Sequence, residues 1–167
     1  QGKRALDEEK VTGFEPFAFS DSRLLILGSF PSVKSRALGF YYGNPQNRFW
    51  QTVCGFFHED VPADVDGKKD FLRRRKLALW DVVTACSITG SSDASIREEE
   101  TADVAALLRR CPVEAVLCNG KTAYSLLMRG EALPVRTVCM PSTSPANPRF
   151  SADIWRAELT RVFGDQR

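Results

Sequence analysis

The chain has 167 residues, of which 43% are hydrophobic and 26% charged, and its formal net charge is +2. A chain of this size and composition is typical of one globular domain, which buries a core without help from disulfides or metals. Its apolar runs are all shorter than the roughly 18 residues of a membrane span, and its first ten residues lack the apolar core of a secretory signal. We therefore expect neither a membrane protein nor a secreted one.

Residues 1–22 carry no sustained hydrophobic period, so we predict an N-terminal arm followed by a single domain over residues 23–167. The expected elements of that domain, in chain order, are strand 24–27, helix 47–57, helix 67–76, strand 77–83, helix 102–110, strand 113–118, helix 120–128, strand 135–139 and a last helix that ends at 163. The expected N-caps are Asp66, Thr101 and Ser151. Alternating strands and helices predict a three-layer α/β/α fold, in which helices cover both faces of a central parallel sheet.

The five cysteines are scattered and form no C-x-x-C pair. Cys111, Cys118 and Cys139 lie in or beside apolar segments, where cysteine usually acts as a small buried hydrophobe. The single histidine, His58, cannot complete a zinc or iron–sulfur site, and we expect it on the surface near a helix end. The pattern therefore favours a protein of the reducing cytosol that binds no metal.

Small polar and aromatic residues follow the first predicted strand. Gly28 and Pro31 end the strand and turn backbone N–H groups outward. An aromatic triplet at 40–42 comes next, and the amide of Asn47 opens the following helix. Ligands of open α/β sheets bind at the carboxyl ends of the strands, so these residue types predict a pocket for a flat polar ring.

The other strand ends carry polar residues that admit two interpretations each. The 140–149 loop, with three prolines and three hydroxyls, either clamps a nucleic-acid backbone or forms a long structural turn. Lys121 either receives a phosphate at a helix start or follows a plain Asn119 cap. Asp81 either acts on a ligand or bonds nearby loop N–H groups. Because the chain has no G-x-S-x-G or H-E-x-x-H motif, we expect chemistry by fixed hydrogen bonds and electrostatics.

Six segments that together span most of the chain occur in the order GSFPS (28–32), FYYGNPQNRFW (40–50), LALWDVV (77–83), GSSDASI (90–96), NGKTAY (119–124) and MPSTSPAN (140–147). This set resembles the uracil-DNA glycosylase superfamily, and within it most closely the hypoxanthine-DNA glycosylase branch. The NRFW and PSTSPAN pieces together are specific, whereas GKTA alone is not. The resemblance implies a four-stranded, mostly parallel sheet flanked by helices, in agreement with the strand count above.

The resemblance also implies roles for particular residues. The 28–32 loop would position the attacking water, although Ser29 stands where most branches have Asn or Asp. A serine can hold a water but is a poor base, so the catalytic amide is assigned to Asn47, as in the N-x-F-W segment of the hypoxanthine branch. Tyr42 falls where relatives place the aromatic ring that stacks on the extruded base. The 140–149 loop would grip the strand and fill the space that the base leaves.

Residues and resemblance together define a predicted site of three groups, with no metal or other cofactor. The catalytic residues are Asn47 and Ser29. The substrate-binding residues are Phe30, Tyr42, Asn44, Phe49, Asp81 and Asn119. The DNA-binding residues are Ser32, Lys34, Ser35, Lys121, Ser142, Thr143, Ser144, Asn147 and Arg149.

The sequence thus predicts a monofunctional DNA glycosylase that flips a deaminated base, hypoxanthine or uracil, out of DNA and hydrolyses its N-glycosidic bond. Its partner would be DNA that contains a deaminated base, and we expect a cytoplasmic monomer, associated with the nucleoid if the source is bacterial. Two other classes of function remain open. One is a nucleic-acid-binding module without catalysis, suggested by Ser29, and the other is an enzyme of free nucleosides or nucleotides, suggested by NGKT at a helix start.

Overall fold

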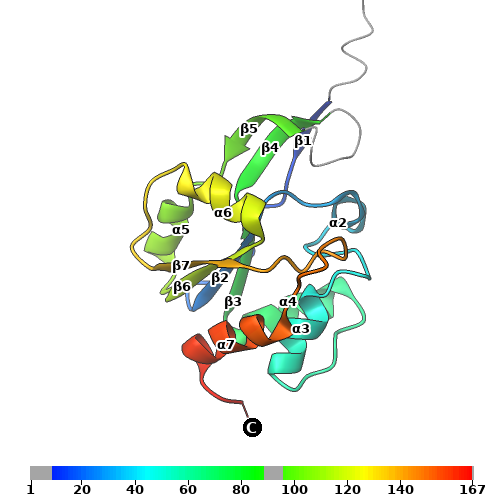
Figure 1. Ribbon diagram of the computed structural model, residues 1–167, viewed down its shortest axis with the longest axis vertical. Coiled ribbons are helices and arrows are strands. Elements are labelled where there is room, and N and C mark those ends of the chain that lie inside the picture. The colour runs from blue at the N-terminus through cyan, green and yellow to red at the C-terminus, as the bar shows by residue number, and fades with distance from the viewer. Residues whose placement is uncertain (1–8, 89–95, 167) are drawn as a thin grey trace, which may run out of the picture.

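In the computed structural model, which describes residues 9–88 and 96–166, four parallel strands form the central sheet (Figure 1). The strands lie in the order β3 (Leu77–Asp81), β2 (Leu24–Gly28), β6 (Ala115–Asn119) and β7 (Arg136–Met140). Every adjacent pair is parallel, so the predicted four-stranded sheet is confirmed. Because the strands run the same way, their carboxyl ends lie along one edge, where Gly28 is opposite Asp81 and Asn119 is opposite Met140.

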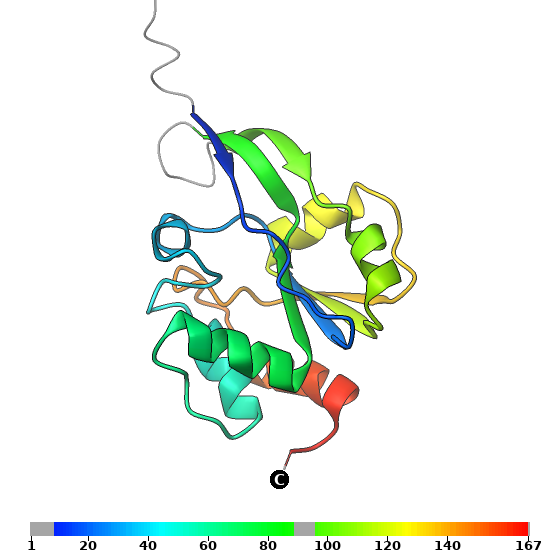
Figure 2. The same ribbon diagram turned by 180° about the vertical axis from the view of Figure 1, so that it is seen from behind.

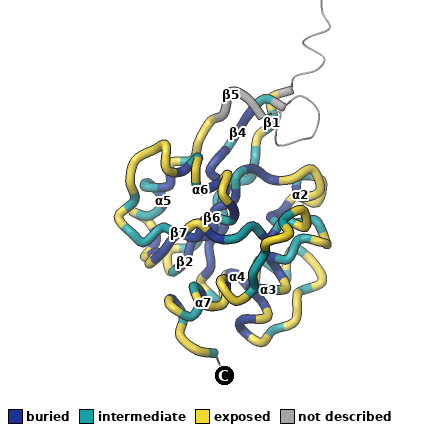
Figure 3. Tube along the Cα trace, in the orientation of Figure 1, coloured by how far each residue is buried: buried dark blue, intermediate teal, exposed yellow. Residues whose placement is uncertain are grey.

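Helices cover both faces of this sheet (Figures 1 and 2), and the alternation of side chains along β2 shows which helices cover which face. Leu24 and Ile26 belong to the core cluster on one face, and Leu25 and Leu27 belong to the cluster on the other. The first face packs against α3 (Phe49–Phe56), α4 (Val65–Arg75) and α7 (Ala152–Phe163), and the second against α5 (Val104–Arg110) and α6 (Lys121–Met128). The four residues of β2 before Gly28 are completely buried (Figure 3). Burial of each of these apolar side chains stabilises the fold by about 1.5–3 kcal/mol. The predicted three-layer α/β/α fold is therefore confirmed.

The chain contains a second sheet that the sequence pattern did not predict. It is antiparallel, with the strand order β1 (Glu9–Thr12), β4 (Val83–Ile88) and β5 (Ile96–Thr101). The strand predicted over 77–83 ends at Asp81, and after Val82 the chain leaves the central sheet and continues as β4. Val82 and Val83 continue the apolar pattern of β3, so the sequence does not show that the chain changes from one sheet to the other here. Most of the GSSDASI segment lies outside the described residues.

Another unpredicted element, the short helix α2 (Val33–Leu38), lies between the strand predicted at 24–27 and the helix predicted at 47–57. The Ser32 side chain caps it by accepting a hydrogen bond from the Ser35 N–H at 3.1 Å, and Gly39 ends it in a left-handed conformation with φ of 89°. With only six residues, α2 is too short for a helical period to be visible in the sequence.

Two of the three predicted N-caps are wrong by two residues. Helix α4 is capped by Asp64, whose carboxylate accepts from the Gly67 N–H at 2.8 Å, while Asp66 lies in the first turn. Helix α5 is capped by Asp103, because the chain remains in β5 as far as Thr101. Ser151 caps α7 as predicted, by accepting from the Ile154 N–H at 3.3 Å. Several residue types can cap a helix, so the sequence alone did not choose between neighbouring candidates.

The remaining expectations concern the arm, the cysteines and the histidine. Within residues 9–22, Phe17 pairs with Leu79 of the edge strand β3 through two backbone hydrogen bonds of 2.9 Å. Cys139 is exposed rather than buried, because β7 is an edge strand that the helices cover incompletely. His58 is exposed just after α3, as expected. None of the helices in the described ranges is long and apolar enough to cross a membrane.

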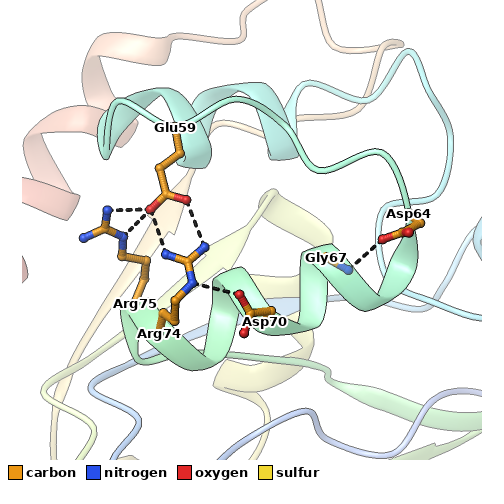
Figure 4. Close-up of polar contacts among 6 residues, drawn as sticks. All are labelled: Glu59, Asp64, Gly67, Asp70, Arg74 and Arg75. Atoms are coloured by element: carbon orange, nitrogen blue, oxygen red, sulfur yellow. Dashed lines mark hydrogen bonds and ion pairs between the residues drawn. The ribbon is translucent and has the colours of Figure 1, made fainter.

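An ion-pair network ties the end of α3 to the end of α4 (Figure 4). Glu59 accepts hydrogen bonds from the guanidinium of Arg74 at 3.0 and 3.2 Å and from that of Arg75 at 2.6 Å, and Arg74 also binds Asp70 at 2.9 Å. These bonds, with Arg74 the largest contributor, hold the pKa of Glu59 below its ordinary value of 4.5, although partial burial acts in the opposite direction. A carboxylate whose pKa is lowered by folding stabilises the fold at any pH above its ordinary pKa. This stabilisation is lost as the pH falls from the ordinary pKa through the lowered one.

Glu59→Gln should therefore lower the free energy of unfolding by about 1 kcal/mol at neutral pH. The difference from wild type should shrink as the pH falls below 4.5, because protonation of Glu59 removes its charge in the wild type as well. Thermal unfolding of both proteins across this pH range measures the effect, with Glu114→Gln, which removes the exposed ion pair to Arg23, as the matched control. A gap between Glu59→Gln and wild type that stays constant with pH would contradict the assignment.

Candidate active site

A cavity of about 210 Å³ lies at the carboxyl edge of the central sheet, and four separate segments line it. Its lining residues are Gly28, Ser29, Phe30, Pro31, Ser32, Ser35, Tyr41, Tyr42, Asn44, Asn47, Asp81, Asn119, Ser142, Thr143, Ser144 and Pro145. The predicted convergence of Ser29, Tyr42, Asn47 and Ser142 on one cavity is therefore observed. Tyr41 and Pro145 are lining residues that the sequence did not single out.

Close packing at the strand ends requires a glycine at position 28. A Cβ atom there would lie 2.5 Å from Oδ1 of Asp81 and 3.3 Å from the hydroxyl of Tyr42. The first distance is shorter than any real contact, so a side chain at this position would displace Asp81. Asp81 is only 5% exposed and lies at the end of β3, so its carboxylate is fixed in the cavity wall.

The ring of Tyr42 is stacked on that of Phe49, with centroids 4.2 Å apart and an angle of 21° between the planes. Phe49 is completely buried and does not line the cavity, so the predicted contact of Phe49 with a substrate is wrong. The physical reason is its place in the first turn of α3, on the face that packs into the core. Burial and the nearby Asp81 carboxylate raise the pKa of Tyr42 above its ordinary value, while the Asn119 side chain lowers it by less. The Tyr42 hydroxyl therefore stays protonated, and its ring lines the cavity with Phe49 packed against it.

Two carboxamides in the cavity wall have their oxygen atoms engaged by the backbone. Asn47 Oδ1 accepts from the Phe49 N–H at 2.9 Å, and Asn44 Oδ1 accepts from the Gln46 N–H at 3.0 Å. Their Nδ2 groups make no hydrogen bond to any residue in the described ranges. Both side chains are thus oriented by local bonds, and each keeps an N–H₂ donor available in the cavity.

The loop after β7 forms the remaining wall, and Thr143 anchors it. The Thr143 N–H donates to Asn119 Oδ1 at 2.9 Å, and Asn119 Nδ2 donates back to the Thr143 hydroxyl at 2.9 Å. Each polar group of the Asn119 amide thus has one bond to Thr143, and the second N–H of Nδ2 and the second lone pair of Oδ1 are left for another partner. Asn119 lines the cavity, so its predicted contact with a substrate stays a prediction. The cap of α6 is Gly120, so the alternative of Asn119 as a plain helix cap is wrong.

The predicted DNA-binding residues divide into supporting and exposed positions. Ser35 is buried and its hydroxyl accepts from the Gly43 N–H at 2.8 Å, so it supports the cavity wall, and the prediction of a surface contact is wrong because α2 turns it inward. The Asn147 amide donates to the Ser142 carbonyl at 2.9 Å within the loop. Lys34, Lys121 and Arg149 are exposed. Lys121 and Arg149 line a second depression of about 650 Å³, which shares Ser142 and Ser144 with the cavity.

A further residue with a structural role in this wall, Arg48, was not predicted. Its guanidinium donates to backbone carbonyls of the loop after β7, although it does not itself line the cavity. The signal was present in the NRFW segment, where Arg48 follows Asn47. Within the described ranges, no group of three His, Cys, Asp or Glu side chains is arranged to hold a metal ion.

Comparisons with known proteins agree on one family. The sequence pattern of the Uracil DNA glycosylase superfamily matches residues 16–158. A hypoxanthine DNA glycosylase of Methanosarcina acetivorans is 38% identical over 155 residues, which cover 90% of this chain and 96% of that protein. A hypoxanthine DNA glycosylase of Methanosarcina barkeri is 34% identical over 144 residues, or 84% of this chain and 90% of that protein.

A solved structure has the same fold. The solution NMR structure of a candidate uracil DNA glycosylase from Methanosarcina acetivorans superposes with a TM-score of 0.79 at 34% identity, over 93% of this chain and 99% of that one. The family match spans all four strands of the central sheet and the loops that line the cavity. The chain belongs to the uracil DNA glycosylase superfamily.

Proposed function

We propose that this protein removes hypoxanthine from DNA by hydrolysing the N-glycosidic bond of a flipped deoxyinosine. The observation that carries the proposal is the cavity itself, in which aromatic, amide and carboxylate side chains from four segments meet at the carboxyl edge of the sheet. The names of the two Methanosarcina relatives support the choice of base. Uracil is included as a second substrate, because it presents the same polar groups.

The size of the cavity supports a single base as its occupant. At about 210 Å³ it is smaller than the roughly 300–1,000 Å³ of sites that take drug-sized ligands, so it favours a base over a whole nucleotide. A base within a duplex reaches such a cavity only by rotating out of the stack, at a cost of a few kcal/mol that is least for a mispaired base. Hypoxanthine opposite thymine, the product of adenine deamination, meets that condition.

The polar groups of the wall match the edge of hypoxanthine, which offers a carbonyl oxygen beside a ring N–H. The free Nδ2 groups of Asn44 and Asn47 and the backbone N–H groups of Ser29 and Phe30 are the donors suited to the carbonyl. The Asp81 carboxylate is the acceptor suited to the ring N–H. Adenine has its donor and acceptor in the opposite order, so this arrangement disfavours the undamaged base.

The chemical step needs stabilisation of charge more than a strong base. A water placed by Ser29 adds its oxygen to C1′ of the sugar, and the base leaves with the electrons of the glycosidic bond. The proton that the water loses neutralises the departing base. The sugar is positively charged in the transition state and the base carries the developing negative charge. The Asn47 N–H₂ group is a fixed donor for that charge, because Phe49 already orients the amide. The reaction as proposed uses no metal or other cofactor.

The DNA would lie across the cavity mouth. In this proposal Lys34, Lys121 and Arg149 contact phosphates, and the loop 141–149 fills the space that the base vacates. We further propose that the enzyme is a monomer and acts in the cytoplasm on DNA that contains deaminated bases.

The proposal is tested by incubating the purified protein with duplexes that carry one inosine or one uracil, followed by alkali to cleave abasic sites. We expect strand cleavage at inosine, and none in a matched duplex with adenine at that position. Folded protein that leaves both inosine and uracil in place would contradict the proposal. Cleavage of free deoxyinosine at the same rate as inosine in DNA would instead favour an enzyme of nucleosides.

Asn47→Ala should lower the single-turnover rate on inosine-containing duplex about 10²- to 10³-fold, the usual effect of losing one donor to a developing oxyanion or similar charge. Affinity for the DNA should change little, because the donor acts mainly in the transition state. Rates at saturating enzyme and binding to DNA with a non-cleavable inosine analogue separate the two effects. The control is Gln46→Ala, an exposed neighbour outside the cavity. Equal losses of rate and affinity would argue against a catalytic role.

Tyr42→Ala should weaken both analogue binding and cleavage by about 5- to 150-fold, because stacking of a base on an aromatic ring contributes about 1–3 kcal/mol. Tyr42→Phe keeps the ring and its support by Phe49, so it should stay within about threefold of wild type. Both variants share the left-handed backbone of position 42, with φ of 54°, so their comparison isolates the ring. If Tyr42→Ala binds and cleaves like Tyr42→Phe, the ring is part of the packing alone.

A further inference from the structure

We infer that Arg48 is a positioning residue, which sets the distance between the Asn47 amide and the opposite wall of the cavity. The inference rests on the proposed function, because it deepens the account of the same site. Arg48 itself does not line the cavity. It acts through its two neighbours, the start of α3 on one side and the loop after β7 on the other.

The guanidinium of Arg48 makes three contacts with the loop. One nitrogen, Nη2, donates to the backbone carbonyls of both Ser144 and Asn147, the latter at 2.9 Å. The guanidinium carbon, Cζ, lies over the ring of Phe150, 4.5 Å from its centroid. These contacts span the loop from its middle to its end, so one side chain fixes the loop along much of its length.

The backbone of Arg48 adds a fourth contact. Its N–H donates to the Thr143 carbonyl at 3.0 Å, and Thr143 is the residue that Asn119 binds from the other side. Arg48 also lies between Asn47 and Phe49, whose bond of 2.9 Å orients the catalytic amide proposed above. The segment that aims Asn47 and the segment that carries Ser144 are thus joined through one residue.

The loop needs such an external tie because of its own sequence. Pro141, Pro145 and Pro148 have no N–H, so the loop cannot form a regular backbone ladder of its own. A lysine ammonium has three N–H donors and could also bind both carbonyls, but it has no flat delocalised group to place over the ring of Phe150. Arginine makes both kinds of contact at once, so we expect lysine to replace it only in part.

A purely structural role is the competing explanation, and Arg23 is the matched control for it. Arg23 has contacts of the same kinds, since Nη2 donates to the Val162 carbonyl at 2.7 Å and the guanidinium lies 5.2 Å from the Phe163 centroid. It precedes β2, at the edge of the sheet opposite the cavity. Any loss common to arginines that tie down a chain segment should therefore appear in Arg23→Ala as well.

The experiment compares Arg48→Ala, Arg48→Lys and Arg23→Ala on an inosine-containing duplex. For Arg48→Ala we expect the maximal single-turnover rate to fall about 10- to 100-fold, the usual effect of a misplaced catalytic group, with a change of less than about threefold in the half-saturating DNA concentration. Arg48→Lys should regain only part of the rate, and added guanidinium ion should raise the rate of Arg48→Ala. Arg23→Ala should remain within about twofold of wild type in rate while it lowers the melting temperature. An Arg48→Ala rate within about twofold of wild type, or an equal loss in Arg23→Ala, would overturn the inference.

A second measurement does not depend on activity. Amide hydrogen exchange should become faster in Arg48→Ala over residues 44–50 and 142–150 together, and in Arg23→Ala over neither segment. Unchanged exchange in both segments of Arg48→Ala would refute the coupling even if the wild type cleaves DNA. A different outcome is a wild type that fails to cleave inosine-containing DNA while Arg48→Ala still exchanges faster over both segments. That result would refute the proposed function and the effect of Arg48 on catalysis, but it would leave intact the structural link that Arg48 makes between the two segments.

Discussion

Thr143 is 1% exposed, and it is hydrogen bonded on two sides by residues from different parts of the chain. Its N–H and hydroxyl bind the Asn119 amide at the end of β6, and its carbonyl accepts from the Arg48 N–H just before α3. The loop after β7 has few backbone bonds of its own, so these contacts determine where it lies, together with the Arg48 guanidinium and a bond of 2.8 Å from Trp155 Nε1 to the Pro141 carbonyl. The rest of the cavity follows from this position, because Ser142, Ser144 and Pro145 form one wall only while Thr143 is anchored.

The other walls are supported by close packing around the residues that line the cavity. The ring of Phe49 is stacked on that of Tyr42, and the absence of a side chain at Gly28 leaves the space that Asp81 and the Tyr42 hydroxyl need. The apolar central sheet underlies them all, since it aligns the strand ends from which these residues come. A site of this kind is preorganised, and its donors need little rearrangement when charge develops in the transition state.

The central sheet could be predicted from sequence because four buried strands leave an unmistakable apolar pattern, and the convergence of Ser29, Asn47 and Ser142 followed from the rule that parallel strands end at one edge. Helix α2 and the small antiparallel sheet could not, because a six-residue helix shows no period and the apolar run through Val82 hides a bend. The partners of individual side chains were also out of reach. That the Asn119 amide binds Thr143, and that Phe49 lies in the core rather than in the cavity wall, depends on packing between distant segments.

The central claim is that a flipped base occupies this cavity while its bond to the sugar is cleaved. A crystal structure of the protein with a duplex that carries a non-cleavable deoxyinosine analogue tests the claim most directly. We expect hypoxanthine within the cavity, parallel to the Tyr42 ring, with the Asn47 N–H₂ group within hydrogen-bonding distance of the base. A complex in which the base remains stacked in the duplex, or lies against another surface while the cavity is closed by the protein, would contradict it.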